Sequence, residues 1–359
     1  MQKFRFLTSG ESHGKCLNAI IEGMPSQIPI DVDFINNELA RRQQGYGRGA
    51  RMQIETDKVE IKSGVRFGYT TGAPICLEIE NKDWQNWVVP MSIDEVDLSD
   101  EEIAQACFDK KITKVRPGHA DLAGAIKYSY DDVRNILERS SARETASRVA
   151  VGAVAKLLLR EFCINFSSTV KKVGNAVFEE DIKKEIDRAR EQGDTLGGLV
   201  EVKIENVPVG LGSFVHWDRR LDGLLAQAVM SIPAIKSVEI GAGVDVSEML
   251  GSQTHDEIFF EKGQYVRKTN NAGGIEGGMS NGESIIVRAA MKAIPTMKKP
   301  LRSVDISTKE PIEAHFERSD TCAVEACAVV CEAMCAIVLA NAFLEKFGGD
   351  SLLEIRHKN

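Results

Sequence analysis

The segment from about Thr321 to Phe347 constrains the fold more than any other part of the sequence. Its high content of Ala, Val, Cys and Met predicts a long helix that is largely buried. The chain has 359 residues, of which 43% are apolar and 27% charged, so it is long enough to form the large core that such a helix needs.

The cysteines of this segment raise the question of a metal site. Cys327, Cys331 and Cys335 are spaced four residues apart, which lines them along one stripe of a helix. A tetrahedral ion needs ligands that surround it, so we interpret these cysteines as small core residues. The other cysteines suggest no disulfide framework.

Strand and helix patterns alternate along the whole chain without a repeat or a linker. The predicted strands span about 3–8, 17–21, 59–65, 75–80, 163–173, 199–204, 235–240 and 284–291. The predicted helices span about 31–42, 134–160, 179–192, 218–231 and 321–347. We therefore expect a single domain over residues 1–359.

Charge and hydropathy limit the partners of the protein. A formal net charge of -8 and a pI near 5.5 argue against a nucleic-acid binder with a general basic face, so any functional positive charge has to be local. Residues 1–14 lack the apolar core of a signal peptide, and the apolar run Ala333 to Phe343 is too short to cross a bilayer. We expect a cytoplasmic protein with no membrane contact.

Local positive charge is concentrated in residues 41–51, Arg-Arg-Gln-Gln-Gly-Tyr-Gly-Arg-Gly-Ala-Arg. Four arginines and no acid repel one another, so we expect that an anion is needed to order this segment. The arginine fork suits phosphate or carboxylate, and the glycines let the backbone approach a ligand. A solvated basic turn and an RNA-binding tail are the alternatives, although such tails are usually longer and terminal.

Two short turns contain histidines. His13 lies in the turn Gly10-Glu11-Ser12-His13-Gly14, where it is more readily exposed to a cleft than to a core. His119 follows the Pro117-Gly118 pair, with Lys114 and Arg116 just before it. Each turn is either a functional site or an ordinary connection.

Helix starts provide further candidate anion sites. Ser141 with Glu144 forms a predicted capping box, and Arg139 and Arg143 lie at the same helix end, where free N–H groups favour a negative ligand. Asp320 lies just before the long helix and either caps it or has a function.

The glycine-rich stretch 270–282 excludes two nucleotide-binding motifs. It lacks the Lys-Ser/Thr ending of a P-loop and is followed by a strand pattern, which excludes a Walker-type site and a dinucleotide fingerprint. It is either a flexible loop or a backbone that closely approaches a flat or anionic ligand. The strand after it ends at Lys292 to Thr296, which supplies a cation and a hydroxyl.

Taken together, six of these blocks resemble chorismate synthases. They are residues 10–14, 41–51, 116–121 and 139–145, the Gly-Gly-Met-Ser-Asn-Gly of the glycine-rich stretch, and 318–320. They occur in the family's order between about residues 4 and 345. The sequence departs from the family pattern at Gln44, where glycine is frequent, and at Ala293, where proline is common.

The resemblance implies the last step of the shikimate pathway. In that reaction 5-enolpyruvylshikimate 3-phosphate loses phosphate and a C6 hydrogen in an anti-1,4-elimination that gives chorismate. The family requires reduced FMN, and either NADPH or a separate flavin reductase supplies the electrons. The implied architecture is an α+β sandwich with a helical layer between two antiparallel sheets, and the implied assembly is a homotetramer.

The same resemblance assigns roles to residues. His13 would be the acid for the departing phosphate, His119 would donate to the flavin, and Asp320 would assist at the flavin N5 with support from Ser12 and Ser141. The residues that would hold the substrate anions are Arg42, Arg48, Arg51, Arg116, Arg143 and Arg318. Those that would surround the flavin are Arg139, Ser140, Ser141, Ala142, Ala234, Gly277, Lys292, Thr296 and Arg318.

Two other functions would use the same features. A non-catalytic phosphate-recognising or RNA-binding protein would use the arginines, but it gives no reason for His13, His119 and Asp320 to accompany them. An ordinary flavin oxidoreductase would need a nicotinamide site, for which the sequence carries no signal.

Overall fold

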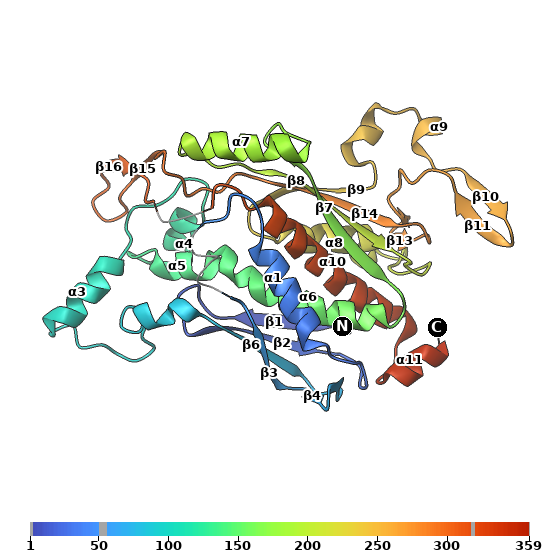
Figure 1. The fold of residues 1–359 in the computed structure, drawn as a ribbon, viewed down its shortest axis with the longest axis horizontal. Coiled ribbons are helices and arrows are strands. Elements are labelled where there is room, and N and C mark those ends of the chain that lie inside the picture. The colour runs from blue at the N-terminus through green and yellow to red at the C-terminus, as the bar shows by residue number, and fades with distance from the viewer. Residues whose placement is uncertain (1–2, 50–55, 317–319, 359) are drawn as a thin grey trace.

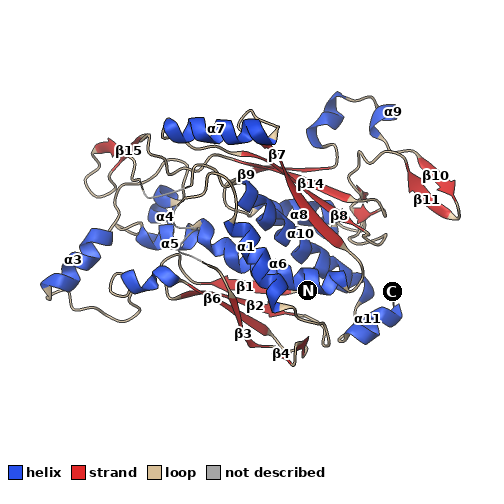
Figure 2. Cartoon of the chain, viewed as in Figure 1, coloured by secondary structure: helices blue, strands red, loops and turns tan. Residues whose placement is uncertain are grey.

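A computed structural model describes residues 3–49, 56–316 and 320–358. Two four-stranded antiparallel sheets lie on either side of a layer of helices (Figures 1 and 2). The N-terminal sheet has the order β1-β2-β6-β3, and the C-terminal sheet has the order β7-β8-β14-β9. This arrangement confirms the predicted α+β sandwich.

The strands and main helices follow the predicted ranges closely. The N-terminal sheet contains β1 (Arg5–Ser9), β2 (Cys16–Glu22), β6 (Ile75–Glu80) and β3 (Val59–Ser63). The C-terminal sheet contains β7 (Asn165–Val173), β8 (Gly198–Glu205), β14 (Ile285–Met291) and β9 (Ile235–Ile240). The helical layer contains α1 (Val32–Gln43), α6 (Thr145–Arg160), α8 (Leu221–Met230) and α10 (Val324–Phe347).

Shorter elements surround this sandwich. The helices are α3 (Glu101–Lys110), α4 (Asp121–Tyr128), α5 (Arg134–Ser140), α7 (Glu179–Glu191), α9 (Gly251–Thr254) and α11 (Leu352–Lys358), with 3-10 turns η1 (Lys82–Asn86), η2 (Ala142–Glu144), η3 (Trp217–Arg219) and η4 (Gly243–Glu248). The strands form the pairs β4 (Val65–Arg66) with β5 (Tyr69–Thr70), β10 (Ile258–Glu261) with β11 (Gln264–Arg267), β12 (Ile275–Glu276) with β13 (Met279–Ser280), and β15 (Arg302–Val304) with β16 (Pro311–Glu313). The glycine-rich stretch is therefore built around a short hairpin.

Buried and exposed side chains alternate along the strands, so each sheet has one apolar face. On β2, Leu17, Ala19 and Ile21 are buried, and the residues between them are more exposed. On β8, Val200 and Val202 are buried in the same alternation. Successive strand residues point to opposite faces, so the apolar face of each sheet packs on the helical layer.

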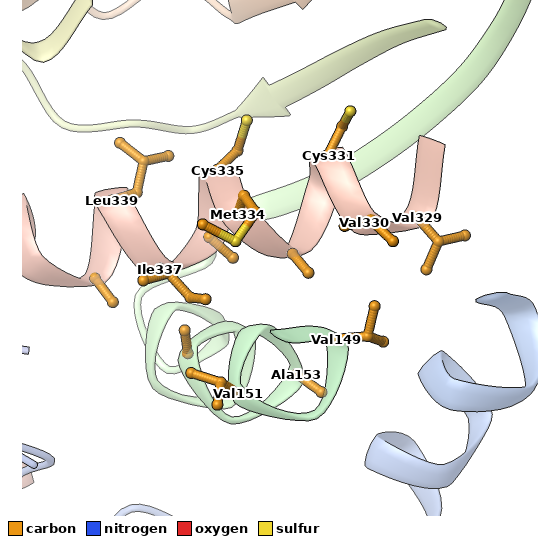
Figure 3. Packing of buried hydrophobic residues seen from close by; sticks show 14 of the residues in the cluster. Val149, Val151, Ala153, Val329, Val330, Cys331, Met334, Cys335, Ile337 and Leu339 are labelled. Carbon is orange, nitrogen blue, oxygen red and sulfur yellow. The ribbon is translucent and has the colours of Figure 1, made fainter. Parts of the chain in front are cut away.

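The helices α6 and α10 cross at close range in the middle of this layer. A Cβ atom on Gly152 would lie 2.4 Å from the Cβ of Ala333, which leaves room only for glycine. In Figure 3, Met334 and Ile337 face α6, whereas Cys331 and Cys335 point to the opposite side of α10. The small residues of both helices thus set their separation.

The environment of α10 explains its composition. By length and hydropathy α10 could cross a membrane, so the apolar segment is longer than the predicted run from Ala333 to Phe343. Its most apolar stretch is nevertheless 89% buried inside the protein, as in a core helix. Cys327, Cys331 and Cys335 are buried free thiols, and burial raises the pKa of Cys335 to about 12. Within the described ranges no cluster of His, Cys, Asp and Glu could hold a metal. The burial of Cys327, Cys331 and Cys335 agrees with the prediction that they are core residues.

A buried charge cluster also joins the helices of this layer. Lys156 of α6 contacts the carboxylates of Glu38 on α1 and Glu332 on α10. Arg41 binds both Glu332 oxygens through its two terminal nitrogens, at 3.1 and 3.0 Å. Burial alone would raise the pKa of Glu332, but the charge of Lys156 and the hydrogen bond from Arg41 outweigh it and lower the pKa to about 2. The cluster therefore remains ionised and fixes the end of α1 against α10.

Candidate active site

A cavity of about 1050 Å³ opens where the N-terminal ends of α6 and α10 meet loops that extend from both sheets. Most of the residues selected from the sequence line it. These are Ser12, His13, Arg42, Arg48, Arg116, His119, Arg139, Ser140, Ser141, Ala142, Arg143, Ala234, Lys292, Thr296 and Asp320. Three do not belong to this set: Gly277 lies in the β12–β13 turn and does not line the cavity, and Arg51 and Arg318 are outside the described residues.

The connection between α5 and α6 forms one wall. The predicted helical region 134–160 is interrupted here, and Ser141 caps the short turn η2 by accepting a hydrogen bond from Arg143 N at 3.3 Å. The predicted capping box is half wrong, because the Glu144 carboxylate binds Arg148 and Thr8. The Ser141 hydroxyl donates to Ser12 Oγ at 3.2 Å, which brings the N-terminal turn and the helix start together.

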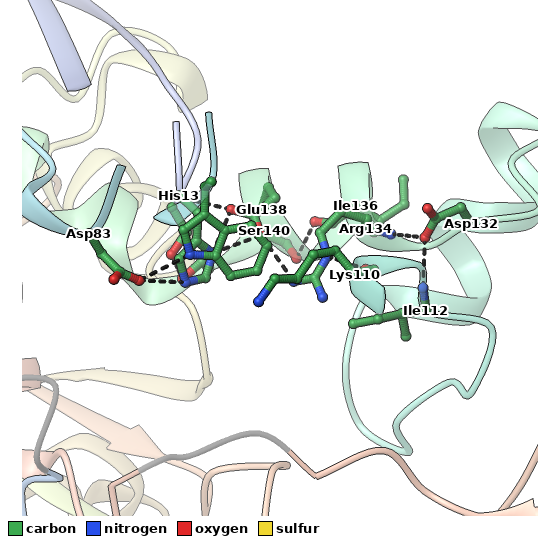
Figure 4. A network of polar contacts seen from close by, with 12 residues as sticks. His13, Asp83, Lys110, Ile112, Asp132, Arg134, Ile136, Glu138 and Ser140 are labelled. Carbon is green, nitrogen blue, oxygen red and sulfur yellow. Dashed lines mark hydrogen bonds and ion pairs between the residues drawn. The ribbon is translucent and has the colours of Figure 1, made fainter. Parts of the chain in front are cut away.

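His13 is held by its neighbours on several sides (Figure 4). Its Nδ1 lies 2.8 Å from Glu138 Oε1, and its backbone N–H donates to Glu138 Oε2 at 2.7 Å. The imidazole stacks on Trp87, with 4.0 Å between the ring centroids and 22° between the planes. His13 Nε2 lies 3.9 Å from Asp83. The ring is buried but borders the cavity, which confirms that this turn faces a cleft.

His119 and Arg116 share one buried carboxylate. Asp121 accepts from Arg116 Nε at 2.8 Å and lies 2.5 Å from His119 Nδ1. Burial would raise the pKa of Asp121, but the hydrogen bonds from His119 and Arg116 outweigh it and hold the pKa well below its usual range. Arg116 also donates to Thr296 Oγ1 at 3.1 Å. The single carboxylate of Asp121 therefore orients both Arg116 and His119, which line the cavity.

Arg42 and Arg143 are arranged in the same way around Asp57. Arg143 Nη1 donates to Asp57 Oδ1 at 2.6 Å, and Arg42 Nη1 lies 3.4 Å from Oδ2. Arg42 Nε also donates to Thr145 Oγ1 at 2.9 Å. Burial lowers the pKa of Arg42 to about 10, which still leaves it a cation at neutral pH. The cavity thus contains two buried guanidinium groups whose orientation is fixed.

Carboxylates of the protein itself bind the arginine segment after α1. Tyr46 N donates to Glu325 at 3.0 Å, and Gly49 N donates to Asp320 at 2.6 Å. Arg48 Nε lies 3.3 Å from Asp320 Oδ2. Within residues 44–49, Glu325 and Asp320 therefore supply negative charge from the protein itself. The expectation that a bound anion orders the whole segment stays a prediction.

Asp320 does not cap the long helix. The helix begins at Val324, and the residue in the capping position is Ala323, which makes no side-chain cap. The Asp320 carboxylate instead faces the cavity and the arginine segment. The sequence alone could not distinguish an aspartate that caps the helix from one that has a function.

Apolar and basic groups also line the cavity. The apolar ones include Ile232, Pro233, Met291, Ile294, Pro295 and Val330. Ala234 has a φ of 72°, a conformation that costs energy for a residue with a Cβ. Lys292 contacts the Gly118 carbonyl oxygen, and burial together with the nearby Lys236 lowers its pKa.

Several residues of the site were missed by sequence reasoning. Glu138, Asp57 and Trp87 carried no motif, and Arg148 was counted only within a helix, although it lines the cavity and pairs with Glu144 at 2.9 Å. Asp121 lay within a selected turn but was given no role. For Glu138 and Asp57 the available signal was weak, since their partners His13 and Arg143 are 125 and 86 residues away in the sequence.

Comparisons with known proteins agree over nearly the whole chain. The family model described as chorismate synthase matches residues 4–344. The chain is 57% identical over 354 residues to a chorismate synthase of Thermoanaerobacter pseudethanolicus, covering 98% of this chain and 96% of the relative. It is 55% identical over 386 residues to a chorismate synthase of Geobacter sulfurreducens, covering 98% and 96% respectively.

A solved structure supports the same relationship. It is titled "Crystal Structure of Chorismate Synthase", with a TM-score of 0.78, 42% sequence identity and coverage of 100% of this chain and 96% of that one. Family, fold and cavity agree, and the chain belongs to the chorismate synthase family.

Proposed function

We propose that this protein is a lyase that converts 5-enolpyruvylshikimate 3-phosphate to chorismate by anti-1,4-elimination of phosphate. The observation that carries the proposal is the convergence of His13, His119 and several arginines on one cavity. The family relationship makes this the first reaction to test. The reaction would be the last step of the shikimate pathway.

The cations of the cavity match the charges of this substrate. The substrate carries one phosphate and two carboxylates, and Arg42, Arg48, Arg116 and Arg143 all reach the cavity wall. Each is supported by a carboxylate, so the guanidinium groups are positioned before a ligand arrives. A charge-assisted hydrogen bond contributes about 1.5–3 kcal/mol, so a few of them suffice for binding. Arg51 and Arg318 would complete the set.

His13 would act as the general acid for the departing phosphate. Its Nδ1 is engaged by Glu138, which leaves Nε2 as the nitrogen that can deliver a proton. An acid is needed because the phosphate oxygen gains negative charge as the C–O bond breaks. Proton transfer at that oxygen lowers the barrier to its departure.

Reduced FMN would occupy the remaining part of the cavity. A volume of about 1050 Å³ is large for one small ligand, which supports a flavin beside the substrate, and apolar lining residues would suit a flat ring. Arg139, Ser140, Ser141, Ala142, Ala234, Lys292 and Thr296 would surround it, with Arg318. Gly277 lies outside this cavity, so the position of its turn gives no support to its assignment.

When bound, reduced FMN supplies electron density transiently and is regenerated, so the reaction has no net redox change. His119 would donate a hydrogen bond towards the flavin, and Asp121 orients it for this task. Asp320 would assist at N5 with support from Ser12 and Ser141, which line the same cavity and hydrogen-bond to each other. Asp320 first has to exchange its present contacts with Arg48 and Gly49.

We also propose, from the family relationship, a cytoplasmic homotetramer. The electrons for FMN would come from NADPH or from a separate flavin reductase. Turnover with FMN and NADPH alone, without a reductase, would separate these two sources. We propose no nucleic-acid or membrane partner.

An anaerobic assay tests the reaction directly. Purified protein is mixed with chemically reduced FMN and the substrate, and phosphate release and the absorbance of the diene product are followed together. Oxidised FMN serves as the control and should give no product. Absence of product from folded protein would reject the proposal, and substrate binding without turnover would favour a non-catalytic anion-binding protein.

A further inference from the structure

Glu138 is a buried carboxylate that contacts His13 at two points. It lies on α5, is 1% exposed, and accepts from the backbone N–H of His13 at 2.7 Å while its Oε1 lies 2.8 Å from His13 Nδ1. Arg134, one helical turn earlier, donates to the same Oε1 at 3.1 Å. The carboxylate thus connects a helix to the turn that carries His13.

The protonation state of Glu138 determines which nitrogen of His13 carries a hydrogen. Burial alone would raise the pKa of Glu138, but the hydrogen bonds from His13 and the charges of His13 and Arg134 outweigh it and lower the pKa. An ionised carboxylate only accepts hydrogen bonds. His13 Nδ1 is therefore the donor to Glu138, and Nε2, which lies 3.9 Å from Asp83 Oδ2, is the nitrogen that Glu138 leaves for proton delivery.

Trp87 fixes the remaining freedom of the ring. It stacks on His13, and its indole N–H donates to Asp83 at 3.1 Å. Lys110 Nζ lies 4.3 Å and Arg134 Cζ 5.0 Å from the indole centroid, so cations also contact this tryptophan. Rotation of the imidazole about its Cβ–Cγ bond would break both the stacking and the Glu138 hydrogen bond.

We propose that Glu138 is a positioning residue that fixes His13 through Nδ1 and so dedicates Nε2 to proton delivery into the cavity. This inference rests on the proposed function. In the step itself the Nε2–H proton passes to the phosphate oxygen, and the electron pair of the breaking C–O bond goes to the phosphate. The ring is left neutral with its proton on Nδ1, and water returns a proton to Nε2.

The isosteric change Glu138→Gln tests the role, because it removes the charge and keeps the shape. We expect kcat to fall about 10- to 100-fold, as for other residues that orient a reacting group, with the substrate Kd within about twofold of wild type. Glu138→Asp keeps the charge and should recover part of the lost kcat. The matched control is Glu201→Gln, which removes a carboxylate that is paired with Arg288 and Lys171 and does not line the cavity, and which should leave kcat unchanged.

Nitrogen-15 NMR of the histidine rings supplies a readout that does not depend on turnover. The His13 signal is identified by its loss in His13→Gln. In wild type the neutral ring should carry its proton on Nδ1, and in Glu138→Gln a large share should shift to Nε2. If the glutamine variant does not fold, kcat of Glu138→Asp is measured instead. The shorter side chain draws the carboxylate away from His13 Nδ1, so kcat should fall, and an unchanged kcat in that folded variant would overturn the positioning role.

The two measurements separate the possible failures. An unchanged His13 tautomer in Glu138→Gln, or a kcat within twofold of wild type in the folded variant, would overturn the positioning role. If the tautomer responds as expected but wild type makes no chorismate, the positioning role stands and the proposed reaction is rejected.

Discussion

Arg42 and Arg143, which come from different segments of the chain, bind opposite oxygens of the single carboxylate of Asp57. Arg143 Nη1 lies 2.6 Å from Oδ1, and Arg42 Nη1 lies 3.4 Å from Oδ2. All three residues are buried, so the orientation of both guanidinium groups depends on one acid. A multiply charged anion that enters the cavity meets cations whose repulsion Asp57 has already reduced.

Replacing Asp57 by Asn should destabilise the protein by about 3–5 kcal/mol, because two buried cations lose their counter-charge. Inorganic phosphate should restore more stability to this variant than to wild type, since it can supply the missing charge. Urea unfolding with and without phosphate measures both effects. The exposed change Glu60→Gln is the control, and a loss below about 1 kcal/mol for Asp57→Asn would contradict the inference.

Replacing His13 by Ala should lower kcat by a factor of about 10² to 10⁴, the usual contribution of a general acid. Substrate binding should change little, because the arginines hold the anions. Rapid-quench kinetics and equilibrium binding separate the two quantities. His216→Ala, which removes an exposed histidine paired with Asp218, should behave as wild type. Comparable losses in kcat and in affinity would argue against an acid role.

Replacing Arg48 by Ala should weaken substrate binding by about 1.5–3 kcal/mol, the value of one charge-assisted hydrogen bond. Binding of FMN alone should be nearly unaffected. Isothermal titration with each ligand makes the comparison, and Arg66→Ala, an exposed arginine beside Phe67, is the control. An unchanged substrate Kd would remove Arg48 from the binding site.

The elements of the fold could be predicted from the sequence because their signals are local. Asp31, at the start of the predicted helix 31–42, caps α1 by accepting from Phe34 N at 3.0 Å, and the apolar content of α10 reflects its burial. The pairing order of the sheets depends on contacts between distant segments, such as β14 with β8, and periodicity alone carries no such information. The prediction of a helical layer between two sheets came from the resemblance to chorismate synthases.

Most of the residues selected from the sequence line the cavity, but the carboxylates that hold its cations and histidines were not predicted. Arginine and histidine stand out in a sequence when they lie beside glycine, because such turns are seldom core. Their carboxylate partners do not: Glu138 is 125 residues from His13, and Asp57 is 86 residues from Arg143. An acid within a helical or loop pattern looks the same in the sequence whether it is exposed to solvent or buried in support of an active site.

Replacing Gly152 by Ala should destabilise the protein by about 1–3 kcal/mol or more, because the added methyl group would overlap the backbone of Ala333. The helices α6 and α10 would have to separate, and their N-terminal ends border the cavity. Thermal unfolding measures the loss. The control is Gly223→Ala in α8, where the nearest atoms lie 4.0 Å from the new Cβ and the change should be neutral or stabilising. Equal stability of the two variants would contradict the close packing.

Replacing Glu332 by Gln should make the stability of the protein less sensitive to acid. The pKa of Glu332 is about 2 in the folded protein and about 4.3 in an unfolded chain. Between these values the unfolded chain binds a proton that the folded protein does not, so the free energy of unfolding falls as the pH is lowered through this window. The contribution of Glu332 to the free energy of unfolding is present above pH 4.3, is lost towards pH 2, and amounts to on the order of 3 kcal/mol.

The glutamine variant should therefore be less stable than wild type at pH 7 but lose less stability between pH 5 and pH 2. Urea unfolding at several pH values gives the slopes, with Glu345→Gln on the exposed side of the same helix as the control. Parallel curves for wild type and Glu332→Gln would show that the acid is not held ionised by Lys156 and Arg41.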